Sequence, residues 1–137
     1  MILFLDACAL IYRFEGDGAY RQATTTLLAQ LAEQNSGAAA VAVSRLSVLE
    51  CRVKSLRDGD SGLIQQYDAF FSACHIVEMN AAVVEQATAL RVRHGLKTPD
   101  ALQAASAMAL PAPVCFFTGD QAFSKVAGLD VRLISLP

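Results

Sequence analysis

Short apolar runs alternate along this chain with longer segments of helical periodicity, and this alternation is the feature that most constrains the fold. An alternation of strands and helices predicts an α/β fold in three layers, with a mainly parallel central sheet of about five strands between helices. The length of 137 residues predicts a single domain over residues 1–137. The expected strands are Ile2–Leu5, Ala40–Val43, His75–Met79, Val114–Thr118 and Val131–Ser135.

Residues that start or end helices mark the boundaries of the expected helices. Leucines at helical spacing predict a helix over Tyr20–Ser36, which Gly37 would end because glycine tolerates the left-handed conformation. Side chains that can cap a helix N-terminus precede three further helical segments. These are Asp60, Asn80 and Thr98, with Gly95 closing the helix that Asn80 begins and Pro99 at the first position after Thr98.

The composition favours a globular protein of the reducing cytoplasm. Hydrophobic residues make up 54 % of the chain, but no apolar stretch approaches the ~18 residues that a membrane span needs. The N-terminal apolar run contains Asp6, so we expect it to be structure and not a signal peptide. Four cysteines without a CxxC pair favour buried thiols over disulfides or a zinc site. The net charge of −2 neither indicates nor excludes a nucleic-acid partner.

Four acidic residues are expected at the carboxyl edge of the sheet. Asp6 and Asp120 follow predicted strands, and Asp100 lies in the first turn of a helix whose N-terminus returns to the same edge. Glu50 lies about one and a half turns into a helix and can reach back to that edge. Because converging carboxylates repel one another, either raised pKa values or bound cations must relieve the repulsion, and a divalent cation is the simpler expectation. Ligation by oxygen alone favours Mg²⁺ or Mn²⁺ over Zn²⁺.

Each of these acids also has a purely structural explanation. A carboxylate at a helix N-terminus accepts hydrogen bonds from free N–H groups and complements the helix dipole. Ser47 and Glu50 even have the spacing of a capping box, in which Glu50 would only fix the start of a helix. Basic residues near the acids could hold phosphates or could form ordinary solvated helix faces. They are Arg45, Arg52, Lys54 and Arg57 around Glu50, and Arg91, Arg93 and Lys97 before Asp100.

Four blocks of sequence carry a resemblance to a known family. LDACALIY, SRLSVLE, KTPDALQAASA and TGDQAF occur in this order, and the likeness extends from Ile2 to Leu136. The chain resembles the PIN-domain ribonucleases and, more narrowly, the VapC toxins of bacterial toxin–antitoxin pairs. That resemblance implies a parallel sheet with helices on both faces, and an acidic pocket that holds Mg²⁺ or Mn²⁺ for cleavage of RNA. Cys8 departs from the family pattern, which often has Ser or Thr at this position.

The resemblance implies a catalytic role for all four acids. Asp6 and Asp100 match the principal metal-binding acids, and Asp120 matches a further acid that often binds metal through water. Glu50 matches an acid proposed to position the metal or the water. A metal held there would lower the pKa of a bound water that attacks the phosphodiester. Small hydroxyl residues expected to hydrogen-bond these carboxylates are Ser44, Ser47 and Thr118.

The resemblance also implies partners: RNA as substrate, a small VapB-like antitoxin as inhibitor, and a second copy of the chain in a homodimer, with no membrane association. A rival hypothesis is a non-catalytic PIN-like module that sequesters a protein or an RNA. The intact set of acids favours the enzyme. Two other phosphate chemistries fail on the residues, because haloacid dehalogenases need an Asp where Cys8 stands, and the tyrosine-phosphatase pattern finds Arg13 one residue too early.

Overall fold

A sheet of five parallel strands forms the centre of the molecule. The computed structural model describes residues 1–34, 40–111 and 113–135. Neighbouring strands are all parallel and follow the order β3-β2-β1-β4-β5. The predicted α/β fold is confirmed. The strands are β1 (Ile2–Leu5), β2 (Ala40–Ser44), β3 (His75–Val77), β4 (Val114–Thr118) and β5 (Asp130–Leu133).

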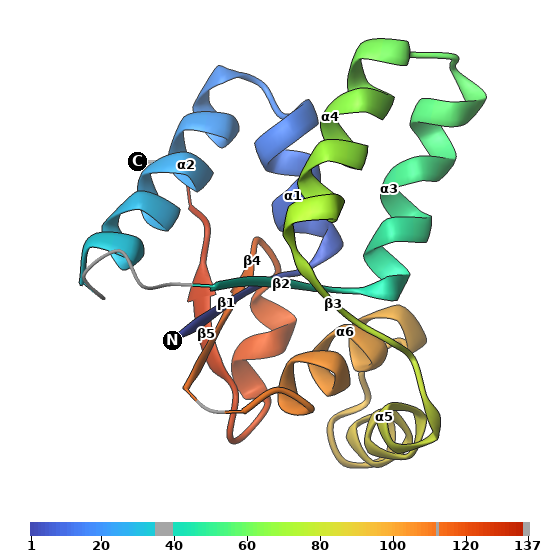
Figure 1. Cartoon of the computed structure of the whole chain (residues 1–137). Helices are drawn as coiled ribbons and strands as arrows, with labels where there is room; N and C mark the ends of the chain where they lie inside the picture. The colour runs from blue at the N-terminus through green and yellow to red at the C-terminus, as the bar shows by residue number, and fades with distance from the viewer. Residues whose placement is uncertain (35–39, 112, 136–137) are drawn as a thin grey trace.

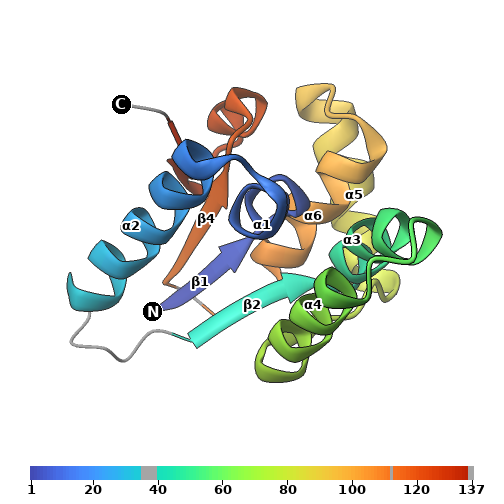
Figure 2. The ribbon, with the colours of Figure 1, turned by 90° about the horizontal axis from the view of Figure 1, so that it is seen from above.

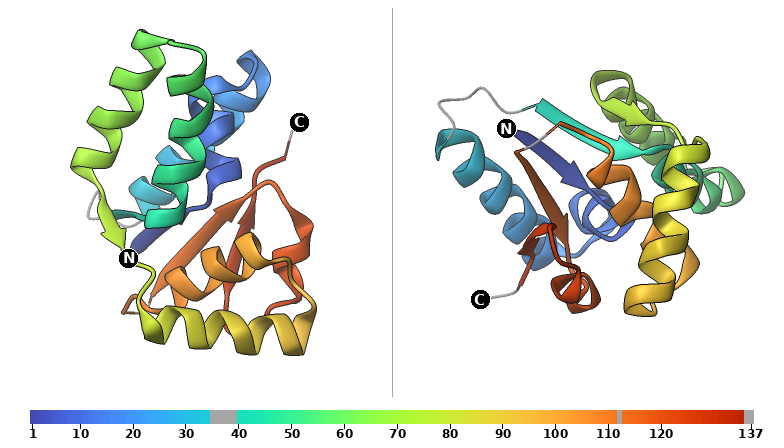
Figure 3. Two further views of the ribbon diagram at one scale, coloured as in Figure 1. Left: turned by 90° about the vertical axis from the view of Figure 1, so that its right-hand side faces the viewer. Right: turned by 90° about the horizontal axis from the view of Figure 1, so that it is seen from below.

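Helices cover both faces of this sheet, which gives the three expected layers (Figure 1). One face carries α1 (Ala7–Glu15), α2 (Gly18–Gln34), α3 (Arg45–Arg57) and α4 (Ser61–Ala73). The other face carries α5 (Ala81–His94), α6 (Thr98–Met108) and the 3₁₀ helix η1 (Gln121–Lys125), as the two views of Figure 3 also show. None of the described helices combines the length and the apolar character needed to cross a membrane.

The two faces of β1 supply two separate hydrophobic clusters, because successive side chains of a strand point to opposite faces of the sheet. Leu3 and Leu5 belong to the cluster under α1 to α4, together with the fully buried Tyr67. Phe4 belongs to the cluster under α5 and α6, where its ring stacks on Phe116 with centroids 5.4 Å apart. Because both faces of the sheet are buried, the sequences of the strands are almost continuously apolar.

Several helix boundaries agree with the capping residues in the sequence. The carboxylate of Asp60 accepts a hydrogen bond from the backbone N–H of Leu63 at 3.1 Å and caps α4. Asn80 caps α5 in the same way, and Gly95 ends that helix in the left-handed conformation with φ 66°. The predicted helix end at Gly37 lies outside the described residues.

Other boundaries differ from the sequence expectation. Thr98 is the first residue of α6 and not its cap, because Lys97 occupies the cap position. The Thr98 hydroxyl instead accepts a hydrogen bond from Arg91 Nη1 at 2.9 Å. The edge strand β3 ends at Val77, since only three residues of β2 pair with it. The last strand starts one residue earlier than expected, at Asp130, and ends two residues earlier, at Leu133, because the pairing with β4 runs from Asp130 to Leu133.

The carboxyl ends of β1 and β4 meet at a switch point of the topology. The chain moves outward from β1 to β2 and β3 and then returns to the other side of β1 as β4. Figure 2 shows β1 between β2 and β4, with α1 starting from the end of β1. In open α/β sheets a crevice forms outside the carboxyl ends of the strands at such a point. This edge is therefore the place to look for a site.

Candidate active site

Four carboxylates from separate parts of the chain line one cavity of about 320 Å³ at this edge. Asp6 follows β1, Glu50 lies on α3, Asp100 lies in the first turn of α6, and Asp120 precedes η1. The structure thus brings together the four acids singled out in the sequence, while their roles as catalytic residues and metal ligands stay predictions. We call this cavity the acidic pocket. Its other lining residues are Ala7, Cys8, Ile11, Tyr12, Pro99, Gln103 and Phe123.

Asp6 is the most deeply buried of the four acids, with 3 % of its surface exposed. Its Oδ1 accepts a hydrogen bond from the backbone N–H of Ala9 at 2.9 Å and so caps α1. Burial raises the pKa of this carboxyl most strongly, and the hydrogen bonds from Thr118 and Ala9 lower it. The charges of Asp100 and Asp120 raise it further, and the resulting pKa is about 6. Asp6 therefore ionises at a cost to the folded protein.

Glu50 and Asp100 also have raised pKa values. For Glu50, which lies at the rim of the acidic pocket and is only partly removed from water, the main cause is this partial desolvation of its carboxyl, and the charge of Asp100 adds to it. For Asp100 the main cause is again burial, followed by repulsion from Asp120, while Lys97 lowers the pKa. Three of the four carboxyls thus resist ionisation, mainly because they are removed from water and in addition because like charges lie near them.

The capping-box interpretation of Ser47 and Glu50 is wrong. The helix α3 begins at Arg45, and Ser44 is its cap because the Ser44 hydroxyl accepts from the backbone N–H of Leu46 at 3.1 Å. Glu50 consequently lies in the second turn of α3 and is not needed to start the helix. Helix capping therefore does not explain why Glu50 lies in the acidic pocket.

The three hydroxyl residues expected to support the acids have different partners. Thr118 hydrogen-bonds the Asp6 carboxylate, and its Oγ1 accepts from the backbone N–H of Asp120 at 3.0 Å. It therefore ties two of the acids together at the end of β4. Ser47, by contrast, accepts a hydrogen bond from Gln103 Nε2 at 2.9 Å, and Ser44 caps the N-terminus of α3.

Among the described residues, the compensation of the acidic pocket by basic side chains is limited to the charge of Lys97, which lowers the pKa of Asp100. In the part of the chain that the structure describes, no lysine or arginine forms an ion pair with any of the four acids. The basic residues around Glu50 have other acidic neighbours, in agreement with solvated helix faces. These pairs are Arg45 with Glu78, Arg52 with Asp68, Lys54 with Glu15, and Arg57 with Asp58.

The donor set suits a hard divalent cation that keeps part of its water. Carboxylate oxygens are the ligands that Mg²⁺ and Mn²⁺ prefer, and Mg²⁺ usually retains several waters when it binds to protein. Over the described ranges, no three His, Cys, Asp or Glu side chains stand close enough to hold a metal ion directly. The residues therefore fit a hydrated cation better than a fully enclosed one.

Two further pocket residues were not singled out from the sequence. Tyr12 packs on Tyr20 with ring centroids 4.4 Å apart, and its ring lies against Gly119. A Cβ atom at Gly119 would lie 2.5 Å from Tyr12 Cε2, which explains the glycine in the TGD block. Gln103 follows Asp100 by one helical turn, a spacing that places both on one face of α6. That spacing is the signal that could have indicated Gln103.

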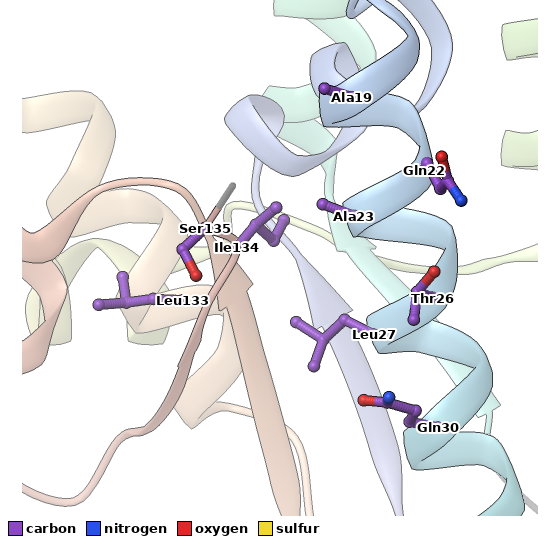
Figure 4. A pocket seen from close by; sticks show the side chains of 9 residues that line it. All are labelled: Ala19, Gln22, Ala23, Thr26, Leu27, Gln30, Leu133, Ile134 and Ser135. Carbon is purple, nitrogen blue, oxygen red and sulfur yellow. The ribbon is translucent and has the colours of Figure 1, made fainter. Parts of the chain in front are cut away.

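A larger pocket of about 460 Å³ lies between α2 and the end of β5 (Figure 4). Figure 4 shows Leu27 pointing from α2 into the space between the helix and the C-terminal segment. The described residues that line this pocket include no ionisable side chain. Because four carboxylates meet in the acidic pocket, it is the candidate active site.

Comparisons with known proteins agree on the fold. The family model of the PIN domain matches residues 3–129. VapBC2 from Rickettsia felis, solved bound to a DNA fragment from their promoter, is similar with a TM-score of 0.78 and 18 % identity, over 98 % of this chain and 100 % of that chain. A toxin–antitoxin complex from Klebsiella pneumoniae gives a TM-score of 0.75 and 20 % identity, over 98 % and 99 %. VapBC-1 from nontypeable Haemophilus influenzae gives 0.72 and 15 %, over 97 % and 98 %. Curated protein sequences give no significant match.

Proposed function

The chain belongs to the PIN-domain family, and from this premise we propose that it is a metal-dependent endoribonuclease that acts as the VapC-type toxin of a toxin–antitoxin pair. The observation that carries the proposal is the acidic pocket, in which four carboxylates meet without an ion-pair partner among the described residues. The whole of residues 1–137 would form one PIN-like domain. Mg²⁺ or Mn²⁺ would be the cofactor.

Asp6, Asp100 and Asp120 would hold the cation, in part through the water that it retains, and Glu50 would complete the catalytic set. A bound divalent cation would offset the carboxylate charges, stabilise charge on a phosphodiester and activate water for attack. Asp6 is oriented for this task, since hydrogen bonds from Ala9 N–H and Thr118 fix its carboxylate.

The burial of the acids suggests how RNA would enter the site. Asp6 lies at the floor of the acidic pocket, while Glu50 and Asp120 are exposed at its rim. A phosphodiester would therefore approach over Glu50 and Asp120 toward Asp6. The rings of Tyr12 and Phe123 contribute an apolar wall, which excludes part of the water beside the carboxylates.

The proposed protein partner is a small VapB-like antitoxin. The similar structures from Klebsiella pneumoniae and Rickettsia felis are complexes of a toxin with its antitoxin. In this chain α3 exposes Leu49, Val53 and Leu56 by 58 %, 52 % and 52 %. Such an exposed apolar face suits an amphipathic partner helix. A homodimer and a cytoplasmic location complete the proposal, and the four cysteines are all free thiols.

The first experiment separates metal binding from the choice of RNA. Purified, partner-free protein is titrated with Mn²⁺ by calorimetry beside Asp100→Asn, and both are then incubated with total RNA in Mg²⁺, in Mn²⁺ and in EDTA. We expect saturable Mn²⁺ binding and RNA cleavage by the wild type, with both lost in the variant and cleavage lost in EDTA. A folded wild type that binds RNA but neither binds Mn²⁺ nor cleaves would contradict the proposal and favour the non-catalytic module.

A further inference from the structure

Gln103 has one unsatisfied end of its side-chain amide in the wall of the acidic pocket. The residue is 3 % exposed and lies one helical turn after Asp100 on α6. Its Oε1 is buried and has no hydrogen-bond partner within the described parts of the chain. A buried acceptor without a donor costs a protein about 1–3 kcal/mol. Such an atom in a pocket wall points to a donor that arrives with the ligand of that pocket.

The other end of the same amide is anchored. Gln103 Nε2 donates a hydrogen bond to Ser47 Oγ at 2.9 Å, and Ser47 is completely buried on α3. One turn further along α6, Ser106 donates a hydrogen bond to Ser44 at 3.1 Å. These bonds join α6, which carries Asp100, to the start of α3, which carries Glu50. The amide is thus held by the interface between the two helices that supply acids to the pocket.

The donor that Oε1 lacks cannot come from the surrounding acids once they are ionised, because a carboxylate only accepts hydrogen bonds. Water on a divalent cation can supply it, since such water donates strongly and the pocket suits a cation that keeps part of its hydration. We propose that Gln103 is a positioning residue whose Oε1 accepts a hydrogen bond from the hydration water of the cation in the acidic pocket. This inference rests on the proposed metal site.

The test compares three single variants in the full-length, partner-free protein by Mn²⁺ calorimetry. Gln103→Leu removes the acceptor, Gln103→Glu keeps an acceptor oxygen, and Ser47→Ala removes only the anchor. We expect Gln103→Leu to weaken Mn²⁺ binding roughly tenfold, as for a hydrogen bond to a charged group. Gln103→Glu should bind at least as tightly as the wild type, and Ser47→Ala should stay within about threefold.

A second readout separates positioning from packing. Water-proton relaxation by bound Mn²⁺ reports on the mobility of its hydration shell, and we expect it to change in Gln103→Leu while Ser47→Ala leaves it as in the wild type. In EDTA, Gln103→Leu removes the unpaired acceptor but also the donor to the buried Ser47 hydroxyl, so the two effects should offset each other and leave the stability close to that of the wild type. If Gln103→Leu does not fold, Gln103→Met takes its place in the same comparison.

The outcomes distinguish this inference from the proposed function. Equal weakening of Mn²⁺ binding in all three variants would mean that Gln103 acts only through helix packing, and the inference would be wrong. Wild-type affinity in folded Gln103→Leu, with binding still lost in Asp100→Asn, would also refute the role of Gln103 and leave the metal site intact. A wild type that binds no Mn²⁺ would overturn both.

Discussion

Asp6 and Asp130 both lie at the ends of strands of the same sheet, but their surroundings shift their pKa values in opposite directions. Asp130 begins β5, and its carboxylate accepts a hydrogen bond from Arg132 Nε at 2.9 Å, which lowers the pKa of Asp130. Asp6 follows β1, is buried among other acids, and has a pKa raised to about 6. One aspartate is neutralised by the chain itself. The other has no ion-pair partner among the described residues, and a raised pKa at a buried acid is typical of functional sites.

The largest expected effect is a loss of RNA cleavage when the charge of Asp6 is removed. Asp6→Asn should lower RNA cleavage by at least about 100-fold, because a ligand of the cation is lost. Asparagine also caps helices well, so α1 should stay folded. The measurement is the cleavage rate at saturating Mn²⁺, with circular dichroism to check folding. The matched control, Asp130→Asn, should cleave RNA at a rate within about twofold of the wild type. An equal loss of cleavage in the two variants would contradict a special role of Asp6.

A second prediction concerns the pH dependence of stability in EDTA. Folding raises the pKa of Asp6 from its ordinary value of 3.8 to about 6, so the folded state binds more protons than the unfolded state between these values. Its contribution to the free energy of unfolding therefore falls as pH rises from about 4 to about 6, by about 3 kcal/mol at ~1.4 kcal/mol per pKa unit.

Urea unfolding of the wild type and of Asp6→Asn at pH 4 and pH 7 measures this contribution. The variant should gain on the wild type by roughly that amount between the two pH values. Asp130 has the opposite sign, because its lowered pKa stabilises the fold above the unfolded pKa and this stabilisation is lost as the pH falls. If the free energies of unfolding of the wild type and of Asp6→Asn differed by the same amount at pH 4 and pH 7, the ionisation of Asp6 would not destabilise the fold.

A third prediction ranks the acids by burial. Asp120 is exposed at the rim of the acidic pocket, whereas Asp100 is partly buried. We therefore expect Asp120→Asn to lower kcat/KM for RNA by roughly tenfold and Asp100→Asn by at least about 100-fold. Asparagine can still cap η1, as Asp120 now does by accepting from Ala122 N–H at 2.8 Å. The reverse ranking would place Asp120 closer to the reacting phosphate than Asp100.

The smallest effect is expected on the stability of the fold when the ion pair between Arg132 and Asp130 is broken. Arg132→Met should lower the free energy of unfolding by less than about 1 kcal/mol, because both side chains are about half exposed and water screens the pair. Thermal denaturation at low salt measures the difference. The pKa of Asp130 should return toward its ordinary value, which NMR titration of the carboxyl detects. A loss of several kcal/mol would mean that the pair is buried in solution.

Local signals in the sequence predicted much of the fold because they act over a few residues. Ile2–Leu5 and Val114–Thr118 are strands with the expected bounds, and Asn80 caps α5 as predicted. The failures have several causes. Thr98 was expected to cap α6, but Arg91, seven residues earlier, engages its hydroxyl. The helix α1 was not predicted although Asp6, which caps it, stands directly before it, because the apolar residues after Asp6 do not separate strand from helix.

The four acids of the candidate site were found from their positions after strands and at a helix start, and the order of their blocks indicated the family. Sequence alone thus determined which residues reach the carboxyl edge of the sheet, because the direction of parallel strands fixes that edge. Tertiary structure decided how those residues are compensated. Arg132 meets Asp130 two residues away, but Gln103 and Ser47 are 56 residues apart and meet only because α6 packs beside α3. Burial and pairing across such separations set the pKa of Asp6 and leave Gln103 Oε1 without a donor, and neither follows from spacing along the chain.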